Sequence, residues 1–112
     1  ALSYLVLANV AVSTSGDSMQ YVELGGRRYS HVVDPRTGMA LTDHCRAMVV
    51  APDGITADGL SKVVGVLGPT KGLKIIEETP GAAAAVDRAP NGQIEHAESS
   101  RWKELPQRAN YR

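Results

Sequence analysis

The feature that most constrains this chain is the segment 29–38, which begins as a β-strand and ends in an Asp-Pro-x-Thr-Gly turn. Aspartate can cap its own turn, proline fixes φ and glycine accepts a left-handed backbone, so the segment is predicted to reverse the chain. His31 lies in the strand, and Asp34, Arg36 and Thr37 follow in the turn. Turn chemistry accounts for Asp34 and Gly38, whereas Arg36 and Thr37 are harder to explain by turn chemistry alone. A strand histidine is more often structural than catalytic, so on the residues alone His31 stays open.

A hairpin is predicted just before this segment. Two β-like runs, 20–24 and 27–33, flank Gly25-Gly26, and two residues able to take positive φ between strands are typical of a tight β-turn. In the second run Tyr29, His31 and Val33 share one face.

The N-terminal run 4–12 (YLVLANVAV) is apolar and predicts a strand buried on both faces. It is followed by small polar residues at 13–17 (STSGD). Such a cluster is typical of a solvated turn. The alternative is a loop whose hydroxyl and backbone N–H groups bind an anion or a sugar.

The middle of the chain changes period from strand to helix. Residues 45–51 predict a strand, and apolar positions from Thr56 to Leu67 form a helical stripe. Thr56 is the expected N-cap, and Gly68-Pro69 is expected to end the helix. A second helix is predicted over 69–79.

The first of these helices carries an unusual stripe of small polar residues. Asp58, Ser61, Lys62 and Gly65 follow one another at i, i+3, i+4 and i+7. Asp58 and Lys62 can form an ordinary i,i+4 ion pair, which needs no function. Gly65 costs about 1 kcal/mol relative to alanine in a helix, and the close approach of another group would account for it.

The C-terminal third predicts two short strands, 82–86 and 93–96, and a final helical turn carrying Trp102 and capped by Ser99 or Ser100. The element order predicts an α+β fold: a mainly antiparallel sheet with a helix pair on one face. We expect one domain over 1–105 and a flexible tail over 106–112.

Composition limits the function classes. The 112 residues have a formal net charge of zero, which gives no electrostatic reason to expect binding to nucleic acid or a membrane surface. Phenylalanine is absent, so the core must be aliphatic. Cys45 is the single cysteine and excludes an intrachain disulfide. No apolar run reaches the roughly 18 residues of a membrane-spanning helix, and no signal peptide is evident. The start at Ala1 suggests a piece of a longer protein.

Three motifs in this order resemble the C-terminal part of the ApbE family of FAD:protein FMN transferases. The motifs are 13–17 (STSGD), 29–38 (YSHVVDPRTG), and 49–68 with its VVAP, TADGLS and VLG segments. The resemblance covers roughly residues 11–76. It implies an incomplete domain of the family's T-fold-related architecture.

The resemblance also implies an activity. Family members bind FAD and a divalent cation, usually Mg²⁺, and transfer FMN to a threonine hydroxyl of a partner flavoprotein. Some hydrolyse FAD to FMN and AMP instead. A family protein would be a periplasmic or membrane-anchored lipoprotein. The resemblance implies that this chain acts as a transferase only if the missing N-terminal half of the site is supplied. A separate N-terminal fragment or a homo-oligomer could supply it.

Site residues follow from the matching positions. His31 is the expected catalytic residue, and Asp58 and Ser61 are the expected metal-binding residues. The nucleotide-binding residues implied are Thr14, Ser15, Gly16, Asp17, His31, Asp34 and Thr37.

One position departs from the family pattern. The family usually has threonine where this chain has Lys62. An ammonium group has three donors and no acceptor, so it cannot ligate a cation. The alternative function is therefore a degenerate flavin-binding or structural homologue without metal-dependent catalysis.

Overall fold

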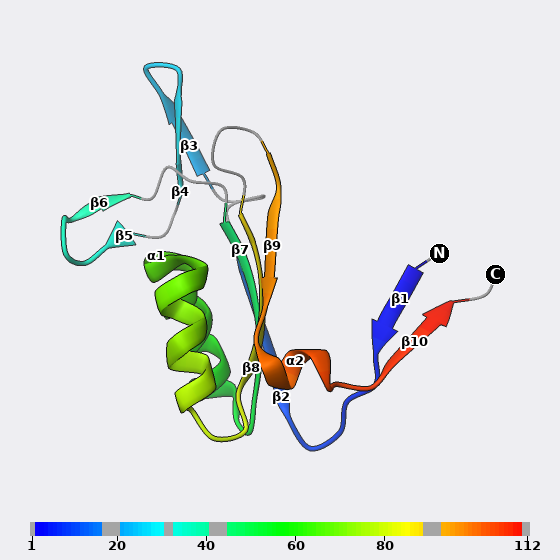
Figure 1. Cartoon of the computed structure of the whole chain (residues 1–112). Helices are drawn as coiled ribbons and strands as arrows, with labels where there is room; N and C mark the ends of the chain where they lie inside the picture. The colour runs from blue at the N-terminus through cyan, green and yellow to red at the C-terminus, as the bar shows by residue number, and fades with distance from the viewer. Residues whose placement is uncertain (1, 17–20, 31–32, 41–44, 89–92, 111–112) are drawn as a thin grey trace.

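A four-stranded antiparallel sheet forms the centre of the molecule (Figure 1). The computed structural model describes residues 2–16, 21–30, 33–40, 45–88 and 93–110. The strand order is β2-β7-β8-β9. The bounds are β2 Ala11–Gly16, β7 Cys45–Ala51, β8 Ala83–Arg88 and β9 Glu95–Glu98.

One long, bent helix covers one face of this sheet. Helix α1 (Gly54–Glu78) changes direction at Gly68, where φ is 82° and ψ is 175°, and Pro69 starts the second arm. The arms 54–67 and 69–78 lie side by side and together act as the predicted helix pair (Figure 1). The N-cap is Asp53, not Thr56, because the Asp53 carboxylate accepts hydrogen bonds from the backbone N–H and the hydroxyl of Thr56.

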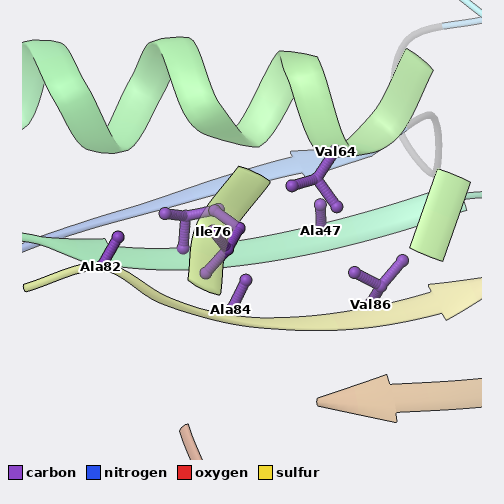
Figure 2. Packing of buried hydrophobic residues seen from close by; sticks show 7 residues of the cluster. Ala47, Val64, Ile76, Ala82, Ala84 and Val86 are labelled. Carbon is purple, nitrogen blue, oxygen red and sulfur yellow. The ribbon is translucent and has the colours of Figure 1, made fainter. Parts of the chain in front are cut away.

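The core between α1 and the sheet is aliphatic, as the composition predicts. Val64 and Ile76 point from the two arms of α1 toward small residues on β7 and β8 (Figure 2). The cluster consists of Ala47, Val49, Val64, Ile76, Ala82, Ala84 and Val86. Small side chains on the sheet let both arms of α1 pack closely against it, and this packing positions Asp58 and its neighbours next to β2 and β7.

The other face of the sheet packs against Trp102. This residue lies in the short helix α2 (Ser100–Lys103) and joins Val50, Ala83 and Ala85 in a second cluster. Beyond it, β1 (Leu2–Leu5) pairs antiparallel with β10 (Gln107–Asn110).

Two hairpins complete the described part of the chain. β3 (Tyr21–Leu24) and β4 (Arg27–Ser30) pair across Gly25-Gly26, whose φ angles of 59° and 78° confirm the predicted turn. β5 (Val33–Asp34) pairs with β6 (Met39–Ala40) across the Asp-Pro-Arg-Thr-Gly turn. The predicted α+β class is therefore confirmed.

Three expectations for local structure are wrong. The run 4–12 is not one buried strand: Asn9 has a positive φ of 58° and Val12 is 49% exposed. Residues 13–16 are not a turn, because pairing with β7 makes them part of β2. The segment 106–112 is not a free tail throughout, because its residues 107–110 form β10 with β1 as partner. In each case a pairing partner distant in sequence overrides the local composition.

No helix within the described residues is long and apolar enough to cross a membrane.

Candidate functional site

A polar contact joins the edge strand β2 to the first arm of α1. The Ser13 hydroxyl donates to Oδ1 of Asp58 over 3.3 Å and lies 3.4 Å from the hydroxyl of Ser61. The Ser61 hydroxyl donates to the backbone carbonyl of Asp58 over 2.7 Å. We call Ser13, Asp58, Ser61 and Lys62 the Asp58 cluster.

The register of β2 decides which of its residues reach this cluster. Ser13 lies opposite Val49 and Ser15 opposite Ala47, both of which face α1. Successive strand residues alternate between faces, so Thr14, opposite Met48, faces the Trp102 side.

The structure places the predicted β2 site residues on two faces of the sheet. Ser15 is buried on the α1 face, whereas Thr14 lies on the opposite face from Asp58, and their nucleotide-binding roles stay predictions. The structure also adds Ser13, which was quoted in the motif but not expected in the site. Gly16 ends β2, and Asp17 lies outside the described residues.

Lys62 pairs with Asp58 inside the cluster. Its Nζ lies 3.7 Å from Oδ1 of Asp58, one helical turn away. The Lys62 side chain is 43% exposed and the Asp58 side chain is 70% exposed. Exposed i,i+4 pairs are weak, contributing about 0.3–0.5 kcal/mol in helices. The ammonium therefore neutralises the carboxylate at low cost and is easily drawn away.

The Asp-Pro-Arg-Thr-Gly turn is closed by its own side chains. Arg36 donates from Nε to Oδ1 of Asp34 over 3.0 Å and from a terminal nitrogen to Oδ2 over 2.7 Å. These bonds hold the pKa of the Asp34 carboxyl below its usual value. The Thr37 hydroxyl accepts from the backbone N–H of Met39. Arg36 and Thr37 thus have turn-forming contacts, although turn chemistry alone was not expected to explain them.

A cavity of about 540 Å³ lies between this turn and the first arm of α1. Two of its lining residues, Arg36 and Lys62, are cationic, and the others are apolar. The lining residues are Val33, Pro35, Arg36, Lys62, Val63, Val66 and Leu67. Cavities of this size and character hold small organic ligands, with a few polar groups fixing the orientation. Lys62 lines the cavity and also pairs with Asp58, so the cavity and the Asp58 cluster share this residue.

The Asp58 cluster has oxygen donors that suit Mg²⁺. Mg²⁺ is commonly bound by one or two carboxylates together with substrate phosphates and water. Asp58 supplies a carboxylate, and Ser13 and Ser61 supply hydroxyl oxygens beside it. No group of three histidine, cysteine or acidic side chains suited to a metal occurs among the described residues. The residues fit a cation that is completed by ligand phosphates, once Lys62 has moved off Asp58.

The predicted catalytic residue, His31, lies outside the described residues, so its placement stays a prediction. Asp34 and Thr37 flank the cavity-lining residues Pro35 and Arg36 along the chain.

A second polar group at the far edge of the sheet has no counterpart in the sequence analysis. His96 on β9 lies 2.5 Å from Asp87 through Nδ1 and 2.7 Å from Glu98 through Nε2. Hydrogen bonds to Glu98 and then to Asp87 raise the pKa of His96 above its usual value. Glu98 lies two residues from His96 on the same strand, whereas only the register of β8 and β9 brings Asp87 opposite His96.

Comparison with known proteins identifies the family. The model of the ApbE family matches residues 1–86. The chain is 38% identical over 100 residues to the FAD:protein FMN transferase of Haemophilus influenzae. That match covers 88% of this chain and 29% of the relative.

Solved structures agree with this relationship. The flavinyl transferase ApbE of Pseudomonas stutzeri, in its apo form, superposes with a TM-score of 0.71 at 38% identity, covering 88% of this chain and 31% of that one. The ApbE protein of Thermotoga maritima superposes with a TM-score of 0.74 at 33% identity, covering 91% of this chain and 33% of that one. The chain thus spans about a third of the length of these relatives. With its family model matched over most of its length, the chain belongs to the ApbE family.

Proposed function

We propose that this chain is part of an FAD:protein FMN transferase and contributes to its flavin-nucleotide site. The observation that carries the proposal is the contact of Ser13 with Asp58 and Ser61 beside the cavity lined by Arg36 and Lys62. A largely apolar cavity with two cations in its lining suits a molecule with a flat ring system and phosphates. Relatives named FAD:protein FMN transferases support the same assignment.

In the proposed reaction a threonine hydroxyl of a partner flavoprotein attacks the phosphorus of the FMN half of FAD. The bond between that phosphorus and the bridging oxygen breaks, AMP leaves, and the hydroxyl proton passes to a base. If water attacks instead, the products are FMN and AMP. His31 stays our candidate catalytic residue, since histidine is the commonest general base.

Asp58 and Ser61, together with Ser13, would hold Mg²⁺ in this proposal. The ion would neutralise charge on the pyrophosphate oxygens when bound. The chain's own contribution is to hold these oxygens together, through the contacts of Ser13 on β2 with Asp58 and Ser61 on α1.

A second candidate function rests on Lys62. Its ammonium lies 3.7 Å from the carboxylate that a cation would need. In this alternative the chain belongs to a flavin-binding homologue that lacks metal-dependent catalysis.

The remaining proposals concern the setting of the site. From the family resemblance we propose that the parent protein is periplasmic or a membrane-anchored lipoprotein. Because the chain spans 29–33% of its relatives, we propose that further polypeptide, as a separate fragment or a second copy, completes the cleft.

The test is release of FMN from FAD by the longest natural form of the protein, with and without Mg²⁺. Asp58→Asn keeps the shape of the side chain and removes its charge, so Mg²⁺-dependent turnover should fall by roughly a hundredfold. Glu78→Gln, the same change at an exposed position at the end of α1, is the matched control and should leave turnover unchanged.

Unchanged Mg²⁺-dependent turnover in Asp58→Asn would contradict the metal assignment. FAD binding without Mg²⁺-dependent turnover in the wild type would favour the second candidate. No binding of FAD at all would overturn both.

A further inference from the structure

Lys62 belongs to two features at once. It forms the ion pair with Asp58, and it lines the cavity between α1 and the Asp-Pro-Arg-Thr-Gly turn. The inference below rests on the proposed function and assigns this residue a ligand.

The two cations that line the cavity are held very differently. Arg36 makes two side-chain hydrogen bonds to Asp34, at 3.0 and 2.7 Å. Lys62 has a looser contact of 3.7 Å with Asp58, whose side chain is 70% exposed. A flexible four-carbon stem with a rotatable ammonium can change partner, whereas the planar guanidinium is already matched to a carboxylate. Lys62 is therefore the mobile positive charge at this cavity.

We propose that Lys62 is a phosphate-binding residue of this protein. Its ammonium leaves Asp58 and pairs with a phosphate of a flavin nucleotide, while the ring system rests on the apolar wall formed by Val63, Val66 and Leu67. The cavity lining supplies positive charge and no carboxylate, which complements an anionic ligand. An ammonium with three donors is suited to phosphate oxygens.

This exchange couples the nucleotide to the cation. With the nucleotide absent, Lys62 neutralises Asp58 and competes with Mg²⁺ for the carboxylate. A bound phosphate draws Lys62 away and frees Asp58. Coupling between two ligands is reciprocal, so each strengthens the binding of the other through the same residue.

The first measurement is calorimetric titration of the longest natural form of the protein with FMN in the presence of EDTA. Lys62→Met keeps the length of the side chain and its helix propensity, and removes the ammonium. We expect FMN affinity to fall about tenfold, the effect of losing one charge-assisted hydrogen bond. Riboflavin, which lacks the phosphate, should bind wild type and Lys62→Met equally. Lys71→Met, at an exposed position on the second arm of α1, is the matched control and should leave FMN affinity unchanged.

The second measurement is titration with Mg²⁺ alone and then with FMN present. Removal of the competing ammonium in Lys62→Met should strengthen binding of Mg²⁺ alone by about twofold. The additional strengthening caused by FMN should be smaller in Lys62→Met than in the wild type.

Equal FMN affinity in wild type and Lys62→Met, with matching circular dichroism spectra, would overturn this inference and leave the proposed function standing. An equal loss of riboflavin affinity would also overturn it, because the contact would then be to the ring. A wild type that binds neither FMN nor FAD would overturn the inference and the proposed function together.

Discussion

Because α1 is bent, alanine substitution is expected to have opposite effects on stability at two glycines of this helix. Gly72, on the second arm, is buried, and a Cβ there would lie 2.9 Å from Cα and 3.3 Å from Cβ of Val64 on the first arm. Gly65 lies one residue from Val64, and a Cβ there would meet nothing within 4 Å. Neither glycine has a positive φ, so alanine is compatible with the backbone at both. Gly72→Ala is expected to destabilise the fold and Gly65→Ala to stabilise it.

The magnitudes follow from the contacts. Carbon atoms pack best at about 3.5–4.0 Å, so the contact at 2.9 Å requires the two arms to separate. Overpacking of a core costs about 1–3 kcal/mol, and alanine regains just under 1 kcal/mol of helix propensity. Because the 2.9 Å contact is to the backbone of Val64, the cost lies in the upper part of that range, and the net destabilisation of Gly72→Ala should be about 1–2 kcal/mol. Gly65→Ala carries the propensity gain alone, about 0.5–1 kcal/mol.

Urea denaturation followed by circular dichroism measures both variants. For a chain of this size, 1 kcal/mol shifts Tm by about 3–6 °C, so the two variants should melt well apart on either side of the wild type. The urea m-value should stay constant, which shows that the change lies in stability. A Gly72→Ala variant as stable as Gly65→Ala would refute the close packing of the two arms.

Two further predictions concern the sheet. Ser99→Ala should lower the free energy of unfolding in urea by about 1–3 kcal/mol, because the buried N–H of Ala84 loses the hydroxyl oxygen that accepts its hydrogen bond at 2.9 Å. An unchanged midpoint of urea denaturation would mean that another acceptor replaces Ser99. Hydrogen bonds to Glu98 and Asp87 raise the pKa of His96 above 6.5 in the folded state. The contribution of His96 to the stability of the fold is therefore complete below pH 6.5 and is lost as the pH rises through the folded-state pKa. Melting curves across pH should show this loss of stability, and His96→Gln should abolish the pH dependence.

Much of the fold could be predicted because its signals are local. The strand 45–51 has the bounds that its apolar run predicts, and the Gly25-Gly26 turn needs only two residues able to adopt positive φ. The helical stripe from Thr56 and the break at Gly68-Pro69 were likewise recognisable from neighbouring residues.

The errors arose where a distant partner decides the structure. Small polar residues at 13–16 form a strand only because β7 pairs with them. The same pairing register turns Ser13 and Ser15 toward α1 and Thr14 away. Asp58 and Ser61 could be predicted from the family pattern in the sequence. Ser13 could be assigned to the site only from the pairing register of β2 and β7. Gly65 was expected to admit a close neighbour, but Gly72 does so instead, because the bend brings the second arm against Val64.

The position of Asp58 is set by strand register and helix packing, whereas the charge beside it is set by Lys62. The two candidate functions differ only in the effect of that charge. Strand register and the packing of Val64 against Gly72 place Asp58 beside Ser13, and neither depends on the side chain at position 62. A relative with threonine at that position can therefore share this backbone and still differ in how it binds a cation. Similarity of fold is compatible with both candidate functions, because it does not report whether Asp58 binds a cation beside Lys62. Mg²⁺-dependent release of FMN by the wild type is thus the measurement that decides between the two functions.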